Sequence, residues 1–345
     1  MSTSDVWRPP NILGKIALWA SRSLLSILGL CLLVPVGHAR TSAPVLRNVE
    51  FHSPAVARAM KYSILLPSEY EHSQERYPTV YLLHGVGGNY TGWTADNNAR
   101  FYAGLFKNLI IVMPDAGNSF YVNWAESNDG RTDDWEDYIV EDVVGHVDAH
   151  FRTIAAREGR AISGLSMGGY GAITLGLRHP DMFGSVGSTS GYLIRARTEA
   201  DRLRRNPKPR TRRRRRRSGA GSPTPDETRM RPDPAIGIEG FSSQDERTPK
   251  GIMFASAEQA DAHDPFKLIH EIPVDKLPHI YLDCGTEDPL IGFTREFARV
   301  LLDKGVTFDF MQMPGGHNSV YWTRALGHVL GVQYEVLQRA LGRRP

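Results

Sequence analysis

The sequence predicts an α/β protein with a mostly parallel central sheet that is covered by helices on both faces. Near-continuous apolar runs of strand length recur along the chain, and segments with helical spacing of apolar residues lie between them. Strands buried on both faces have such runs, and strand–helix alternation is typical of parallel sheets. The chain has 345 residues, of which 41% are hydrophobic, so a sizeable core can form.

The expected strands can be placed in chain order from their apolar runs. They are residues 61–70, 77–85, 108–115, 160–166, the weaker and small-residue-rich 184–191, then 279–285 and 307–315. Helices are expected where apolar residues recur with a helical period, at 134–151, 292–302 and 319–341. Sites in such sheets form at the carboxyl ends of strands, and the chemically suggestive residues of this chain follow such ends.

Residues 1–39 have the features of an export signal. A basic leader precedes the apolar stretch 23–37, which has the length of a signal-peptide core and is short for a membrane span. Cleavage is expected after Ala39, which predicts a secreted or periplasmic protein; an uncleaved membrane anchor is the alternative. Removal of the leader leaves Cys284 without a second cysteine, so no internal disulfide is expected.

The basic charge of the chain is concentrated in one tract. The net charge is +3, and the arginine run 212–217 alone exceeds it. This balance therefore does not indicate a nucleic-acid-binding face on the fold. The run lies in an Arg- and Pro-rich insertion, at about 196–249, within an expected catalytic domain of residues 45–345. The insertion lacks periodicity and is expected to be a mobile loop; contact with an anionic surface and a role as a partial lid are the alternatives.

The stretch 160–172, "RAISGLSMGGYGA", combines an apolar run with clustered glycines around one serine. Its spacing fits neither the dinucleotide fingerprint G-x-G-x-x-G nor the phosphate-binding G-x-x-x-x-G-K-[ST]. It does fit G-x-S-x-G, with Ser166 between Gly164 and Gly168. In a nucleophile elbow the serine sits on a strained turn between a strand and a helix, and the flanking glycines leave room for it. We therefore predict that Ser166 is a catalytic nucleophile.

A nucleophilic serine needs a histidine base, and the base needs an orienting carboxylate. In this architecture the chain order is serine, acid, histidine. His317 follows an expected strand in a glycine loop that leaves the imidazole free to be aimed, so it is the expected base. For the acid, Asp283 lies within an expected strand, whereas Glu287 and Asp288 lie beyond the turn that follows it. The residues alone do not separate Glu287 from Asp288.

Acyl transfer also needs two backbone N–H donors for the oxyanion. One is expected at Met167, directly after the nucleophile. The second is expected at Val86, in the glycine-rich loop after the strand 77–85. His84 in the same loop is expected to order the loop rather than to transfer protons, because its place in the chain is wrong for the base.

The loop after the strand 108–115 contains Asn118, Tyr121 and Trp124. These side chains are expected either to line the substrate pocket or to pack within their own loop. The proposed chemistry requires neither a metal nor a cofactor, and none is expected.

Six ordered motifs carry a resemblance to a known family: "VYLLHGVGGN", "IIVMPDAGNSFYVNW", "DYIVEDVVGHVDAHFRT", "RAISGLSMGGYGA", "DCGTEDPL" and "GGHNSVYW". Together they resemble the esterase D-type branch of the α/β-hydrolases. That group includes tributyrin esterases, S-formylglutathione hydrolases, feruloyl and acetylxylan esterases, and mycolyltransferases of the antigen 85 type. The resemblance implies an α/β-hydrolase fold, a triad of Ser166, Asp288 and His317, and an oxyanion hole formed by the amides of Val86 and Met167.

The function implied by the resemblance is that of a serine carboxylic ester hydrolase. Its expected substrates are short-chain acyl esters or carbohydrate-linked esters, as small molecules or on a polysaccharide. An acyltransferase that uses the same triad is the first alternative, and a non-catalytic binding protein on a hydrolase fold is the second. The insertion at 196–249 departs from the family pattern and leaves the shape of the pocket open.

Overall fold

The computed structural model describes residues 43–127, 130–206 and 248–344. The expected leader, 1–39, and most of the expected insertion, 207–247, lie outside the described residues. Among the helices that are described, none combines the length and the apolar character needed to cross a membrane.

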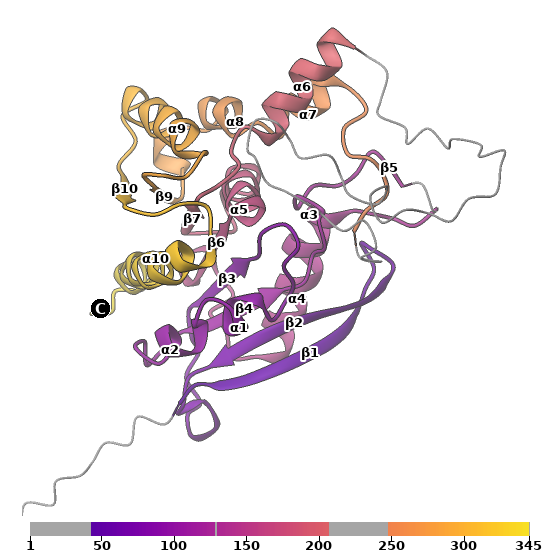
Figure 1. Ribbon diagram of the computed structural model, residues 1–345. Coiled ribbons are helices and arrows are strands. Elements are labelled where there is room, and N and C mark those ends of the chain that lie inside the picture. The colour runs from indigo at the N-terminus through magenta and orange to yellow at the C-terminus, as the bar shows by residue number, and fades with distance from the viewer. Residues whose placement is uncertain (1–42, 128–129, 207–247, 345) are drawn as a thin grey trace, which may run out of the picture. The chain divides into compact units, whose positions relative to one another are not determined.

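Within the described residues, eight strands form one sheet in the order β1-β2-β4-β3-β6-β7-β9-β10. The first two pairings, β1 with β2 and β2 with β4, are antiparallel, and the remaining five are parallel. The prediction of a mostly parallel α/β sheet is therefore confirmed (Figure 1). The strands are β1 (Val45–Ser53), β2 (Arg58–Leu66), β3 (Thr79–Leu83), β4 (Ile110–Pro114), β6 (Arg160–Leu165), β7 (Ser185–Thr189), β9 (His279–Gly285) and β10 (Phe308–Met313).

Helices cover both faces of this sheet (Figure 1). Successive strand residues point to opposite faces, so Ile162 packs in the cluster with one set of helices and Ala161 in the cluster with the other. The first set is α4 (Val144–His150), α5 (Met167–Arg178), α8 (Pro265–Glu271) and α9 (Ile291–Asp303); the second is α1 (Gly92–Ala95), α2 (Ala99–Ala103) and α10 (Ser319–Ala340).

A smaller unit lies beside the loop that follows β4. It consists of the two-stranded sheet of β5 (Glu126–Ser127) and β8 (Gly251–Ile252) together with α6 (Arg195–Arg205) and α7 (Ala257–Asp261). The expectation of an irregular segment from residue 196 is wrong for α6. Ala196, Ala200 and Leu203 recur on one helical face and are buried, so three small or apolar side chains attach a helix that is otherwise rich in arginine.

Other boundaries also differ from the sequence prediction. β1 was not expected, because this edge strand has a single buried residue, at its end. The expected strand 61–70 ends at Leu66, and a 3-10 turn, Tyr70–His72, follows. The expected helix 134–151 is divided into α3 (Trp135–Asp137), a π-helical turn (Tyr138–Val143) and α4. Two further 3-10 turns are Arg157–Gly159 and Val274–Lys276.

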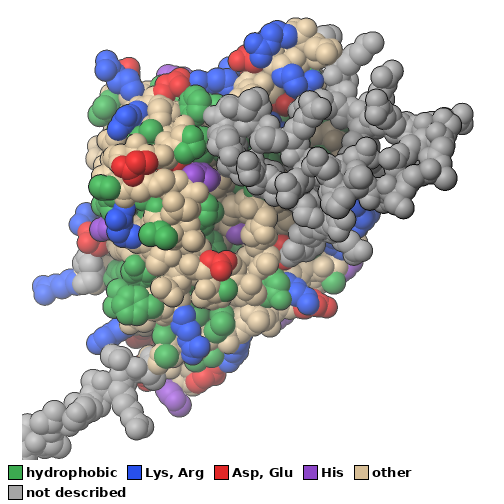
Figure 2. Space-filling view, viewed as in Figure 1, with side chains coloured by type: hydrophobic (Ala, Val, Ile, Leu, Met, Phe, Trp, Pro, Cys, Tyr) green, Lys and Arg blue, Asp and Glu red, His purple; other side chains and the backbone are tan. Residues whose placement is uncertain are grey.

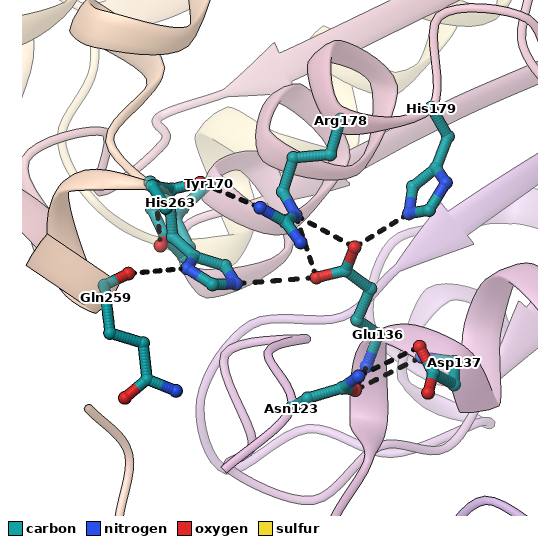
Figure 3. Close-up of polar contacts among 9 residues, drawn as sticks. Asn123, Glu136, Asp137, Tyr170, Arg178, His179, Gln259 and His263 are labelled. Atoms are coloured by element: carbon teal, nitrogen blue, oxygen red, sulfur yellow. Dashed lines mark hydrogen bonds and ion pairs between the residues drawn. The ribbon is translucent and has the colours of Figure 1, made fainter. Parts of the chain in front are cut away.

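A buried ionic cluster holds the carboxyl end of α5 (Figure 3). Glu136 of α3 is 3% exposed, and the Arg178 Nε donates to its two carboxylate oxygens at 2.8 and 3.0 Å. His179 Nε2 lies 2.7 Å from the same carboxylate, and His263 Nε2 lies 3.5 Å from it. Burial alone would raise the pKa of Glu136, but the hydrogen bonds and charges of these partners hold it well below its usual range. The cluster joins α3, α5 and the segment between α7 and α8.

Candidate active site

Ser166 lies on a strained turn between β6 and α5. Its backbone has φ 53° and ψ −113°, a conformation that residues other than glycine rarely adopt. Three backbone hydrogen bonds hold it: the Ser166 N–H donates to Thr189 at 3.0 Å, and its carbonyl accepts from Tyr170 and Tyr192, each at 3.1 Å. The Ser166 side chain therefore lies at the carboxyl end of β6, and three backbone hydrogen bonds hold the backbone of this residue in place.

The flanking glycines are required by close backbone contacts. A Cβ on Gly164 would lie 2.4 Å from the carbonyl group of Gly168, and a Cβ on Gly168 would lie 2.3 Å from the carbonyl oxygen of Leu83. Both distances are far below van der Waals contact, so a larger residue at either position would displace the backbone. The spacing G-x-S-x-G thus follows from the packing of β6, α5 and β3 around the turn.

The structure brings Ser166, His317 and Asp288 into one hydrogen-bonded chain. Ser166 Oγ lies 2.9 Å from His317 Nε2, and His317 Nδ1 lies 2.9 Å from Asp288 Oδ2. The second oxygen of Asp288 accepts the Leu290 N–H at 2.8 Å. Trp322 contacts the imidazole edge to face, with ring centroids 5.0 Å apart. This arrangement can remove a proton from a serine hydroxyl and stabilise the resulting imidazolium.

The two carboxylates beyond the β9 turn have different environments. The Asp288 side chain is fully buried; burial raises its pKa, but the hydrogen bond and charge of His317 outweigh burial and the net pKa is lowered. Glu287 points instead to backbone and hydroxyl donors, accepting from Thr286 Oγ1 at 2.7 Å and from the Gly315 N–H. Of these two carboxylates, only that of Asp288 contacts the imidazole, so the geometry distinguishes two residues that the sequence did not.

Asp283 lies in the core below these loops. It is fully buried in β9 and accepts hydrogen bonds from Thr189 Oγ1 at 2.7 Å and from the Tyr321 hydroxyl at 3.0 Å. Burial raises the pKa of Asp283 to about 7. The Thr189 carbonyl also accepts the Ser166 N–H, and Tyr321 lies four residues after His317 in α10. The hydrogen bonds of Asp283 therefore connect β7, next to the serine turn, with the start of α10, next to the histidine.

His84 orders the loop after β3. Its Nε2 accepts the Ala116 N–H at 3.0 Å, so Nδ1 carries the proton and donates it to the Gly85 carbonyl at 2.8 Å. The Val86 N–H follows in this loop, and the Met167 N–H opens α5. Neither N–H has a hydrogen-bond partner among the described residues. Val86 lines the same cavity as Ser166, and Met167 directly follows Ser166 in the chain, so these two N–H groups stay the expected oxyanion donors.

Asn118, Tyr121 and Trp124 contact protein groups and are not among the residues that line the cavity at Ser166. Asn118 accepts the Gly87 N–H at 2.8 Å, and the fully buried Tyr121 donates its hydroxyl to the His84 carbonyl at 2.8 Å. Trp124 donates its indole N–H to Ser119 at 2.9 Å, within its own loop. Asn118 and Tyr121 therefore support the loop that carries Val86, and the hydrogen bonds of all three residues are those of loop packing.

A cavity of about 960 Å³ opens at Ser166 and His317. Its other lining residues belong to the glycine-rich loop after β3, to the segment around α1 (Gly92, Trp93, Ala95, Asp96 and Asn97) and to the start of α10 up to Trp322, together with Leu165 and Pro289. The sequence analysis did not identify Trp93, Asp96 or Trp322, which become neighbours only through the fold. Within the described ranges, no three histidine, cysteine, aspartate or glutamate side chains converge in a way that could hold a metal ion.

The sheet, the elbow and the serine–histidine–aspartate chain define the α/β-hydrolase class, and comparison with known proteins gives the family. The chain belongs to the family described as "Putative esterase", whose model matches residues 53–331. The resemblance inferred from the motifs is thereby confirmed, and the homologues of the chain include esterases.

Two relatives and one solved structure illustrate the similarity. An esterase of Mycobacterium tuberculosis is 27% identical over 79% of this chain, which spans 56% of that esterase. The diacylglycerol acyltransferase/mycolyltransferase Ag85A of Mycobacterium leprae is 28% identical over 52% of this chain and 57% of its own. The fluorophosphonate-binding serine hydrolase F of Staphylococcus aureus has the same fold, with a TM-score of 0.64 at 22% identity over 84% of this chain and 98% of its own.

Proposed function

We propose that this protein hydrolyses carboxylic esters with short acyl chains or carbohydrate-linked esters, through Ser166, His317 and Asp288 and a covalent acyl-enzyme. The observation that carries the proposal is the continuous chain from Ser166 Oγ through both imidazole nitrogens of His317 to the buried Asp288 carboxylate. It lies beside a cavity large enough for a small ester.

Acylation follows from this geometry. Ser166 Oγ attacks the ester carbonyl carbon while His317 Nε2 takes the hydroxyl proton. Asp288 accepts the Nδ1–H of His317 and stabilises the imidazolium. The N–H groups of Val86 and Met167 donate to the oxyanion of the tetrahedral intermediate. Its collapse expels the alcohol, which receives the proton from His317, and leaves the acyl group on Ser166.

Deacylation repeats these steps with water in place of the serine. His317 takes a proton from a water molecule, which attacks the acyl carbonyl carbon, and the second tetrahedral intermediate uses the same two N–H donors. Collapse returns the proton to Ser166 Oγ and releases the carboxylic acid.

Hydrolysis is favoured over acyl transfer by the extent of the similarities. The match to the Mycobacterium tuberculosis esterase spans 79% of this chain, whereas the match to the mycolyltransferase of Mycobacterium leprae spans 52%. Water is therefore the proposed acceptor.

Replacing each of the two neighbouring carboxylates, in turn, by its amide tests which of them is the catalytic acid. We expect Asp288→Asn to lower kcat for p-nitrophenyl acetate by about 10³- to 10⁴-fold, because an amide at this position favours the wrong imidazole tautomer. The matched Glu287→Gln removes a charge one residue away without touching the imidazole, and is expected to lower kcat by less than about tenfold. Steady-state kinetics with thermal unfolding as a check on folding make the comparison. Equal losses, or a larger loss in Glu287→Gln, would contradict the proposed triad.

A further inference from the structure

Asp96 is the one acidic residue among the described residues that line the cavity at Ser166. Asp96 lies directly after α1, where its N–H donates to the Gly92 carbonyl at 2.9 Å. Its own carbonyl accepts from Thr323 Oγ1 of α10 at 3.2 Å. Both backbone groups of Asp96 are thus held by the elements that form the cavity wall, which places the residue firmly at this position.

The carboxylate of Asp96 is not neutralised by a partner. The side chain is exposed, and it forms no hydrogen bond or ion pair with any residue in the described ranges. Many other carboxylates of the chain do have such partners; Asp133, for example, is paired with Arg58. The Asp96 charge therefore acts on whatever occupies the cavity, weakened only by water and salt.

No lysine or arginine side chain in the described part of the cavity wall offsets this charge. Among the described residues that line the cavity there is no lysine or arginine. His317 gains a positive charge during the reaction, but it faces the Asp288 carboxylate, which balances it. On the face shown in Figure 2, acidic and basic side chains of the described residues are interspersed. The wall also includes the aromatic side chains of Trp93 and Trp322.

We propose that Asp96 is a specificity-determining residue that makes the cavity select neutral ester substrates over anionic ones. Esters with a free carboxylate on the acyl or the alcohol part are disfavoured, whereas uncharged acyl chains and hydroxylated groups are accepted. This inference rests on the proposed function, because it assumes that Ser166 cleaves the ester in this cavity. The expected discrimination is about three- to tenfold in kcat/KM, the size of a Coulomb interaction between exposed charges.

Two substrate pairs, each consisting of a carboxylate and its uncharged methyl ester, provide the test. p-Nitrophenyl methyl adipate and p-nitrophenyl hydrogen adipate place the charge on the acyl part. Methyl p-acetoxybenzoate and p-acetoxybenzoate place it on the alcohol part. The measured quantity is the neutral-to-anionic ratio of kcat/KM in the wild-type protein and in Asp96→Asn. An effect of Asp96 on the oxyanion is the same for both members of a pair and cancels within the ratio. A difference in intrinsic reactivity between the two substrates is the same for both proteins and cancels when the ratios are compared.

We expect Asp96→Asn to lower the ratio by about three- to tenfold for at least one pair, and we expect this difference to shrink as the salt concentration rises from about 20 to about 500 mM. A purely structural role of Asp96 would not produce that salt dependence. Asp181→Asn, which removes an exposed carboxylate that does not line the cavity, is the control and should leave the ratio unchanged.

The outcomes separate the inference from the function on which it rests. Ratios that stay within twofold of the wild type for both pairs at low salt would overturn the selection by charge, as would a wild-type preference for the anionic esters. Neutral esters that are not hydrolysed at all by the wild-type protein would instead contradict the proposed function.

Discussion

Ser166→Ala is expected to lower kcat for p-nitrophenyl butyrate by at least about 10⁴-fold, with the protein still folded. The Oγ is the only atom removed, and it is the atom that contacts His317 Nε2 at 2.9 Å. The members of a triad act as a unit, so His317→Ala should cost about as much, and the double variant little more than either. Steady-state kinetics on purified variants measure the loss, and thermal unfolding verifies that each variant is folded.

A matched control is available in the strand that leads to the elbow. Ser163 is also buried, and its Oγ has no hydrogen-bond partner among the described residues. Ser163→Ala removes the same atom three residues away and is expected to retain most of the wild-type kcat. If Ser166→Ala kept near-normal turnover, the assignment of the nucleophile would be wrong.

The largest expected loss of stability comes from the cluster around Glu136 (Figure 3). Glu136→Gln leaves Arg178 at the cluster without its carboxylate partner. Breaking a buried ion pair on one side typically costs about 3–5 kcal/mol of the free energy of unfolding. Because the cluster holds the carboxyl end of α5, whose amino end carries the Met167 N–H, activity should also be lost at lower temperature than in the wild type.

The pH dependence of this loss has a defined sign. The partners of Glu136 lower its pKa in the folded protein below the unfolded value of 4.5. Its contribution to stability is therefore fully present above about pH 4.5 and declines as the pH falls towards the folded pKa. Urea unfolding of wild type and Glu136→Gln at neutral and at acidic pH measures the difference in the free energy of unfolding, which should be largest at neutral pH.

An exposed pair on α10 provides the control for this prediction. Glu335 and Arg339 form an ion pair of 2.8 Å with both side chains more than half exposed. Glu335→Gln should change stability little at any pH, because exposed pairs contribute little. A Glu136→Gln protein that is as stable as Glu335→Gln at neutral pH would refute the stabilising role of the buried cluster.

The inner strands were predictable because their environment imposes a simple pattern. Strands such as β3 and β4 are buried at every position, so they appear in the sequence as continuous apolar runs. β1 has one partner and no such run, and it was missed. α6 was missed for another reason: its arginines dominate the composition, while Ala196, Ala200 and Leu203 alone make the buried face.

The candidate site was predictable where chemistry and chain order limit the choice. Ser166 and His317 stand in loops that directly follow strands, and both are identified by neighbouring glycines. The acid could not be chosen from the residue types, because Glu287 and Asp288 are both carboxylates in the same turn. They differ in the direction in which their side chains leave that turn. The cavity wall could not be predicted either, since Asp96 and Trp322 lie more than two hundred residues apart in the sequence. They line the same cavity in the fold, where Thr323 of α10 donates a hydrogen bond to the Asp96 carbonyl.

The most direct test of the central claim is the location of the acyl group during turnover. The protein is mixed with p-nitrophenyl butyrate, quenched in acid before the first turnover is complete, and digested for mass spectrometry of the peptides. We expect one butyryl group on the peptide that contains Ser166, and none in Ser166→Ala. A butyryl group on another residue, or one that persists in Ser166→Ala, would contradict the account of this protein as an esterase that acts through Ser166.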